Sequence, residues 1–174
     1  MLTVLEQDYI RYGENRHHMP KFQVYFRKTQ QCQFKPLKLL YKALMVYHRK
    51  KHGNEIYADC KIGGGLYLGH PYGIMINHEC IIGNNVSIHK DVTLGQENRG
   101  KRKGAPILGN DVWIGINSTL VGKITIGNDV LIAPNSFVNF DVPDHSIVMG
   151  NPARIIPPEN ATEGYITNKV DITQ

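Results

Sequence analysis

Histidine is the side chain in this sequence best suited to chemistry near neutral pH, and one of the eight histidines stands out by its surroundings. His70 lies in the segment Gly69-His70-Pro71-Tyr72-Gly73, between two glycines and next to a proline. The ordinary pKa of imidazole is near 6.5, so the ring can accept a proton from a hydroxyl group in a transition state. His70 is therefore a candidate general base.

A second candidate region is the basic segment 96–104, in which three successive cations at 101–103 lie between two glycines. Such a loop could close over a ligand and bind its phosphates, or it could be a solvated loop without a role. The cysteines Cys32, Cys60 and Cys80 show neither CxxC spacing nor a Cys/His ligand pattern. The sequence thus predicts no disulfide framework and no structural zinc site.

An internal repeat of six residues must position these groups. An aliphatic residue recurs at every sixth position, except for a step of eight across His70 and a step of fourteen across segment 96–104. This period does not match a helix, but it suits a short strand followed by a turn, and three such strands make one triangular coil of a solenoid. The repeat predicts a prism of a little over four coils with an aliphatic core. The aliphatic positions are Ile56, Ile62, Leu68, Ile76, Ile82, Ile88, Leu94, Leu108, Ile114, Leu120, Ile126, Ile132 and Val138.

The two interruptions of the repeat coincide with the two candidate regions. The faces of a regular solenoid are uniform, whereas bulges and loops redirect side chains, so we expect function at His70 and at segment 96–104. Cys60 and Cys80 fall on the small inward positions of their repeats, where a thiol acts as a small hydrophobic group.

Composition places the chain among soluble globular proteins of one domain. Hydrophobic residues make up 41% and charged residues 20%, and the longest apolar runs are far shorter than the ~18 residues of a membrane span. The N-terminus carries acids where a signal peptide has a basic leader, so we expect a cytoplasmic protein. Residues 1–54 contain eleven lysines and arginines against three acids, whereas residues 55–174 contain nine against twelve. The basic region could face nucleic acid, an anionic membrane surface or a phosphorylated ligand, but no nucleic-acid motif accompanies it, and a solvated surface of helices is the simpler interpretation.

The pattern divides the chain into three parts. Residues 1–54 form a basic helical region, in which Thr3-Val4-Leu5-Glu6 is a capping box and residues 37–48 show helical spacing. Residues 55–156 contain the coils with loop 96–104. Residues 157–174 form a C-terminal tail, because several prolines after Val138 favour an extended or mobile chain that leaves the prism.

Five motifs between Ile62 and Ile156 resemble those of the hexapeptide-repeat transferases, in particular serine acetyltransferases and the related bacterial polysaccharide O-acetyltransferases. The resemblance implies an all-β solenoid, a left-handed parallel β-helix with a short α-helical region before it, assembled as a homotrimer. The motifs are Gly69-His70-Pro71-Tyr72-Gly73, Asp91-Val92-Thr93-Leu94-Gly95, Asn110-Asp111-Val112-Trp113-Ile114-Gly115, Val142-Pro143-Asp144 and Gly150-Asn151-Pro152-Ala153-Arg154.

The same resemblance implies transfer of an acetyl group from acetyl-CoA to a hydroxyl group, with His70 as the general base and no metal. The family orients this histidine with an aspartate, and the matching position, fifteen residues before His70, holds Glu55. Acetyl-CoA would lie along a prism edge between two subunits. The cofactor-binding positions implied by the resemblance are Gly115, Lys123, Ala133, Pro134 and Arg154.

The acceptor expected from the sequence is a sugar of a surface polysaccharide, and peripheral contact with a membrane-linked substrate is compatible with the basic N-terminal region. Serine acetyltransferases hold the amino acid with an aspartate just before the catalytic histidine and with an arginine and a histidine at the far end of the loop. This chain has Gly69, Gly104 and Ala105 at those positions, and its helical region is shorter. Serine is the alternative acceptor.

Two other functions remain open at this point. Trimeric β-helix proteins of the γ-carbonic-anhydrase type bind zinc with three histidines at a subunit interface, and His70, His78 and His89 are the candidates here. Spacings of eight and eleven residues across an interrupted repeat do not clearly bring them to one face. A non-catalytic scaffold is the other alternative, and a histidine on a bulge argues against it.

Overall fold

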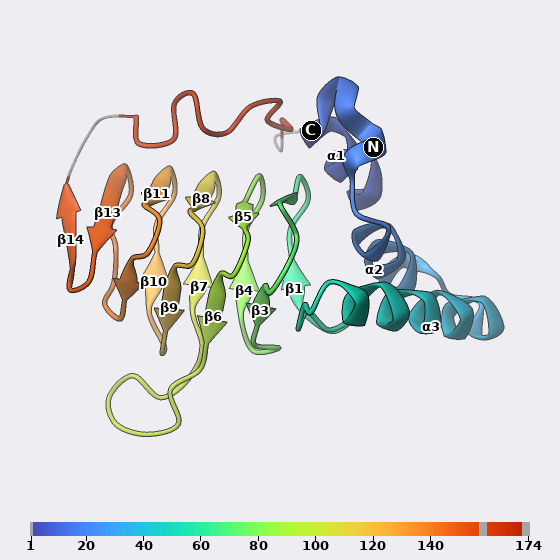
Figure 1. Cartoon of the computed structure of the whole chain (residues 1–174), viewed down its shortest axis with the longest axis horizontal. Coiled ribbons are helices and arrows are strands. Elements are labelled where there is room, and N and C mark those ends of the chain that lie inside the picture. Colours follow the sequence, from blue (N-terminus) through green and yellow to red (C-terminus); the bar gives the residue numbers. More distant parts are fainter. Residues whose placement is uncertain (1, 157–159, 172–174) are drawn as a thin grey trace.

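The chain forms a left-handed parallel β-helix with a group of helices at one end (Figure 1). This computed structural model describes residues 2–156 and 160–171. The helices are α1 (Val4–Arg11), the 3₁₀ helix η1 (Gly13–His18), α2 (Lys21–Gln31) and α3 (Lys35–Lys51). The predicted capping box is present at α1, where the Thr3 side chain accepts a hydrogen bond from the Glu6 backbone and the Glu6 carboxylate accepts one from the Thr3 backbone.

The strands form the three faces of the prism, and each coil adds one strand to each face. The first face contains β1 (Lys61–Ile62), β4 (Ile81–Ile82), β7 (Ile107–Leu108) and β10 (Thr125–Ile126). The second contains β2 (Tyr67–Gly69), β5 (Ser87–His89), β8 (Val112–Ile114), β11 (Val130–Ile132), β13 (Ser146–Gly150) and β14 (Ala153–Ile156). The third contains β3 (Met75–Ile76), β6 (Thr93–Gly95), β9 (Thr119–Val121) and β12 (Phe137–Val138).

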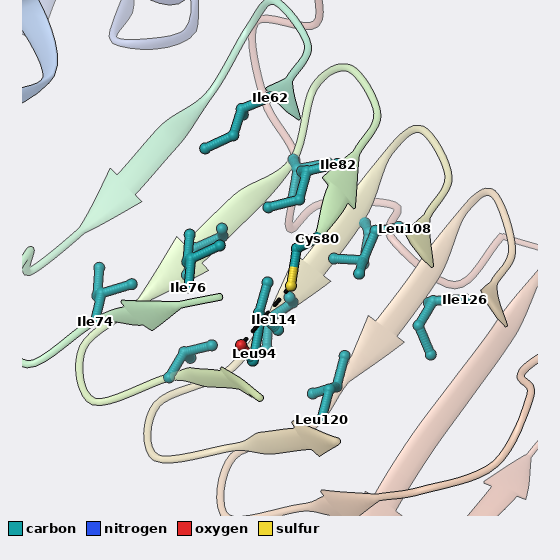
Figure 2. Close-up of a cluster of buried hydrophobic side chains, with 14 of the residues drawn as sticks. Ile62, Ile74, Ile76, Cys80, Ile82, Leu94, Leu108, Ile114, Leu120 and Ile126 are labelled. Atoms are coloured by element: carbon teal, nitrogen blue, oxygen red, sulfur yellow. Dashed lines mark hydrogen bonds between the residues drawn. The ribbon is translucent and has the colours of Figure 1, made fainter. Parts of the chain in front are cut away.

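The core is the stack of aliphatic side chains that the repeat predicts. All thirteen predicted positions are buried, as Figure 2 shows for a part of the stack. Cys60 and Cys80 are buried in the same core, and burial raises the pKa of the Cys80 thiol to about 12. The interpretation of both cysteines as small hydrophobic groups is confirmed.

The helices at the N-terminal end cover the open edge of the first coil with polar side chains. An uncovered edge strand would leave its backbone N–H and C=O groups unpaired. Asp8 and Tyr12 accept from the backbone N–H groups of Leu66 and Leu68, and Arg27 donates to the carbonyl groups of Ile62 and Gly63. Arg27 also forms a buried ion pair with Asp8, at 2.7 Å. Part of the basic N-terminal region is thus buried as a cap, contrary to the expectation of a wholly solvated surface.

The end of the prism lies beyond Val138, the last position of the aliphatic repeat, but within the region 55–156 assigned to the coils. The prolines after Val138 favour a chain that leaves the prism, but β13 continues the second face in parallel to β11, and β14 folds back antiparallel to β13 and closes the edge. Sequence periodicity missed this coil because its turn carries Pro143 and its strand departs from the six-residue pattern.

The described part of the tail, residues 160–171, lies back along one corner of the prism instead of leaving it (Figure 1). Asp129 accepts hydrogen bonds from the backbone of Ala161 and from the backbone and hydroxyl of Thr162. Burial alone would raise the pKa of Asp129, but hydrogen bonds from Thr162, Ala161 and His145 lower it to about 2. Residues 157–159 and 172–174 of the predicted tail lie outside the described residues.

Candidate active site

His70 lies on a corner of the prism that is longer than the corners stacked on it. Five residues separate the buried residues Leu68 and Ile74, whereas three separate Ile88 and Val92 in the next coil. Gly69 pairs in register with His89, and the carbonyl of Tyr72 accepts from Asp91 as in the regular corners, so His70 and Pro71 are the two extra residues. The interruption seen in the sequence is therefore a bulge that adds a histidine to the corner.

The backbone of His70 adopts a conformation that is uncommon for this residue type. Its φ angle is +52°, in the left-handed region, which costs roughly 1 kcal/mol or more for a residue with a Cβ atom. The carbonyl of His70 accepts from Tyr72 at 2.7 Å, which closes a tight turn around Pro71. The side chain is exposed, so the imidazole is accessible to a substrate.

The side chain of Asn54 holds the bulge through two hydrogen bonds to the backbone. The side chain of this residue is buried, donates to the carbonyl of Pro71 at 2.9 Å and accepts from the backbone N–H of Ile74, also at 2.9 Å. Gly73 donates its N–H to the carbonyl of His52, just after α3. The sequence pattern does not single out Asn54, whose only sequence signal is its position next to Glu55.

Glu55 lies on the third face of the prism, beside the residues that directly follow the bulge. Its backbone pairs with that of Met75, the carboxylate is exposed, and the residue lines a cavity of about 330 Å³ with Asn77 and Thr93. Among the described residues no hydrogen bond joins the carboxylate of Glu55 to the ring of His70. The structure thus places the two predicted catalytic residues in neighbouring segments, without a direct contact.

His89 lies directly beside the bulge. Its ring is half-buried between Tyr67 and Trp113, with ring centroids 6.3 and 4.7 Å away, and its Nε2 atom is buried without a hydrogen-bond partner in the described structure. Burial, and then the nearby charge of His70, lower the pKa of His89 to about 4. A Cβ atom on Gly69 would lie 2.3 Å from Nδ1 of His89. No larger residue fits at position 69 unless this ring moves.

Loop 96–104 leaves the prism at a different corner, after β6, and projects from it (Figure 1). The two ends of the loop are joined by backbone hydrogen bonds between Glu97 and Gly104, at 2.9 and 3.0 Å. Lys123 lies at this base, where its N–H donates to the carbonyl of Arg102 at 2.8 Å. The cations of the loop are exposed.

The predicted cofactor-binding residues divide into three places. Gly115 and Pro134 are neighbours at the end of β8 and β11, where a Cβ on Gly115 would lie 2.6 Å from the Pro134 nitrogen, and Ala133 precedes Pro134. Arg154 lies exposed on β14, and Lys123 lies at the loop corner. Gly115, Ala133 and Pro134 thus form one strip at the corner where His70 lies, and the backbone N–H groups of Gly115 and Ala133 donate to the carbonyls of Ile132 and Val148.

The three histidines of the zinc alternative do not form a ligand set. His70 follows β2, His89 ends β5, and His78 follows β3 at another corner. Within residues 2–156 and 160–171, no group of three or more His, Cys, Asp or Glu side chains is arranged to hold a metal ion. The zinc interpretation therefore has no support from the geometry.

Comparisons with known proteins agree with the repeat. Residues 105–139 match a family described as bacterial transferase hexapeptide, six repeats. The chain is 36% identical over 137 residues to serine acetyltransferase 2 of Arabidopsis thaliana, which covers 79% of this chain and 42% of that protein. It is 38% identical over 112 residues to a serine acetyltransferase of Staphylococcus epidermidis, which covers 64% of this chain and 53% of that protein. The chain thus spans about half the length of the curated relatives that it matches.

Solved structures similar to this chain also include serine acetyltransferases. The serine acetyltransferase of Neisseria gonorrhoeae superposes with a TM-score of 0.69 at 27% identity, over 90% of this chain and 65% of that chain. The serine acetyltransferase of Brucella abortus superposes with a TM-score of 0.71 at 26% identity, over 88% and 68% of the two chains. A structure of the Neisseria gonorrhoeae protein in complex with serine superposes with a TM-score of 0.67 at 28% identity, over 88% and 67%.

Proposed function

Because the chain is a hexapeptide-repeat protein similar in sequence and fold to serine acetyltransferases, we propose that it transfers the acetyl group of acetyl-CoA to an acceptor hydroxyl group, with His70 as general base. The observation that carries this proposal is the two-residue bulge, which presents an exposed imidazole at an otherwise regular corner. Acetyl-CoA supplies a thioester, an activated acyl group that an alcohol attacks slowly unless its proton is removed.

In this proposal His70 performs both proton transfers. Its imidazole accepts the proton of the acceptor hydroxyl while that oxygen attacks the acetyl carbonyl, holds the proton on the ring, and returns it to the sulfur that leaves. Glu55 is the positioning residue, which holds the ring in the correct tautomer when substrate closes the site. Catalytic hydrogen bonds of this kind are often absent without substrate and form in the complex.

The donor site in this proposal lies along the strip formed by Gly115, Ala133 and Pro134. The amide groups of the pantetheine arm would pair with backbone at this strip, and Arg154 and Lys123 would meet the phosphates, because guanidinium and ammonium groups pair with phosphate. Lys123 lies at a different corner of the same subunit, so it joins this site only if neighbouring subunits pack corner to corner. The proposal therefore includes a homotrimer.

Serine is the first acceptor to test. The relatives and structures reported above are serine acetyltransferases, and one of those structures contains serine. These comparisons favour serine over the sugar that the sequence departures suggested.

A sugar hydroxyl is the second candidate, and the contact between Gly69 and His89 favours it. The ring of His89 fills the space that an acidic side chain at position 69 would need, and Gly104 and Ala105 supply no charged groups. A zwitterionic amino acid would lose about two charge-assisted hydrogen bonds, each worth ~1.5 to 3 kcal/mol.

The deciding experiment measures thiol release from acetyl-CoA by the full chain with L-serine and with a panel of nucleotide-linked and lipid-linked sugars. Saturable acetylation of serine with a KM in the low millimolar range or below establishes serine as the acceptor. Turnover with a sugar, and none with serine, establishes the second candidate. Absence of transfer to any hydroxyl acceptor by a protein that binds acetyl-CoA contradicts the proposed reaction.

A further inference from the structure

Helix α3 extends away from the prism (Figure 1). Most of its residues are exposed or half-buried. Met45 is its only fully buried residue, and the rings of Tyr41 and His48 pack beside Tyr25 of α2. Large apolar side chains elsewhere on the helix are exposed to solvent. The exposed fractions are 67% for Phe34, just before the helix, and 70% for Leu39, 52% for Leu40 and 64% for Tyr47.

The exposed apolar residues share one face of the helix. Leu39, Ala43 and Tyr47 follow one another at intervals of four residues, and Leu40 lies three residues before Ala43, so their side chains are neighbours on the surface. This face points away from the side that packs on α2. A stripe of this kind on a soluble protein usually marks an interaction surface.

The charges of α3 identify the chemistry of the partner. The helix carries Lys35, Lys38, Lys42, Arg49, Lys50 and Lys51, and no acid between positions 34 and 52. A symmetric contact between two copies of this helix would bring like charges together. A lipid surface with anionic headgroups offers the opposite charge and an apolar layer at once, because amphipathic basic helices lie in the interface with their apolar face at the acyl boundary.

We propose that the exposed apolar face of α3, with the cations beside it, binds the surface of an anionic lipid bilayer. The helix would lie on the bilayer and not cross it, since no helix in the described ranges is long and apolar enough to span a membrane. The C-terminal end of α3 is hydrogen-bonded through His52 to Gly73 of the bulge. Binding through α3 would therefore hold the His70 corner near the headgroups.

Cosedimentation of the full chain with vesicles tests this proposal. We expect binding to vesicles that contain phosphatidylglycerol and phosphatidylcholine, weak or no binding to phosphatidylcholine alone, and loss of binding at high salt. Equal binding to both vesicle types, or binding to neither, would overturn the proposal.

Two variants test whether vesicle binding depends on α3. Leu40→Glu places a charge in the apolar face, and Lys38→Gln with Lys42→Gln removes two cations; each should weaken binding to anionic vesicles roughly tenfold or more. The matched control is Ile156→Glu, at a side chain that is 45% exposed on β14 at the other end of the prism, and it should bind as the unaltered chain does. The lysine variant changes only exposed side chains, so it gives a result even if Leu40→Glu lowers the melting temperature.

Light scattering distinguishes the bilayer from a second copy of the chain. The mass of the particle should be the same for the unaltered chain and for Leu40→Glu. A smaller particle in the variant would show that this face contacts another copy, and it would overturn the proposal, as would unchanged vesicle binding by both variants.

Discussion

The two interruptions of the coil differ in how firmly the protein holds them. The bulge at His70 is two residues longer than a regular corner, and the buried side chain of Asn54 bonds to Pro71 within it and to Ile74 just after it. Loop 96–104 is longer, and backbone hydrogen bonds between Glu97 and Gly104 hold it at its base. A base must stay within hydrogen-bond reach of its proton, whereas a segment that covers a ligand must move. The difference fits the proposal that the bulge provides the base and that the loop provides access or binding.

Replacing the base should have the largest effect. We expect His70→Ala to lower kcat of acetyl transfer by roughly 10² to 10⁴, with acetyl-CoA binding nearly unchanged, because only proton transfer in the transition state is lost. Steady-state kinetics and calorimetric binding measure the two effects. His17→Ala, at an exposed histidine in η1, is the matched control. Retention of more than about a tenth of the activity would show that another group is the base.

Removing the side chain that holds the bulge should have the next largest effect on activity. We expect Asn54→Ala to lower kcat by roughly 10 to 10² with a smaller change in KM, because a small misplacement of the base costs rate. The free energy of unfolding should fall by about 1 to 3 kcal/mol, since the N–H of Ile74 loses its partner in a buried place. The control is Asn98→Ala in the loop, which should change neither quantity. An unchanged kcat in a destabilised Asn54 variant would assign this residue to folding alone.

The sequence predicts the features of the bulge and the loop that are local in the chain, and it does not predict those that depend on tertiary contacts. The repeat predicts thirteen buried aliphatic positions and both interruptions, because inward positions and added residues are local properties of a periodic chain. The anchoring of the bulge by Asn54 and the burial of His89 beside Trp113 depend on tertiary contacts between residues distant in the sequence. The six-residue period does not predict such contacts. The sequence also does not reveal that Arg11 and Arg27 are buried in the cap, because their role is to pair with backbone of the first coil.

Removing charge from the loop should have a smaller effect. If its cations bind the phosphates of acetyl-CoA, Lys101→Ser with Lys103→Ser should raise KM for acetyl-CoA about threefold to fivefold, with kcat within about twofold. Thermal melting should be unchanged, because both side chains are exposed. A fall in kcat at constant KM would contradict a role limited to binding and would place the loop in the catalytic step.

Low pH should destabilise the protein by protonating His89, and this is the smallest of the four expected effects. The folded state lowers the pKa of this ring to about 4, so the unfolded chain, with an ordinary pKa near 6.5, binds more protons between these values. Stability from the neutral ring is therefore complete above pH 6.5 and is lost as the pH falls toward 4. Because the ring is half-buried, we expect a loss on the order of 1 kcal/mol. His89→Phe should flatten this part of the pH dependence in denaturant titrations, and an identical slope in the variant would contradict the assignment.

The C-terminal segment 160–171 changes how such a molecule comes apart. Coils of a solenoid contact only their neighbours, so the ends can fray one coil at a time. Here Thr162 is bound to Asp129, Val170 exchanges two hydrogen bonds with Asn85, and the carbonyl of Thr167 accepts from Arg11 beside the first coil. Segment 160–171 thus runs back from Asp129 to helix α1, and it links coils that are far apart in the stack. The coils between Arg11 and Asp129 are therefore held by this strap as well as by their neighbours, so their unfolding should begin with release of the strap and then involve these coils together.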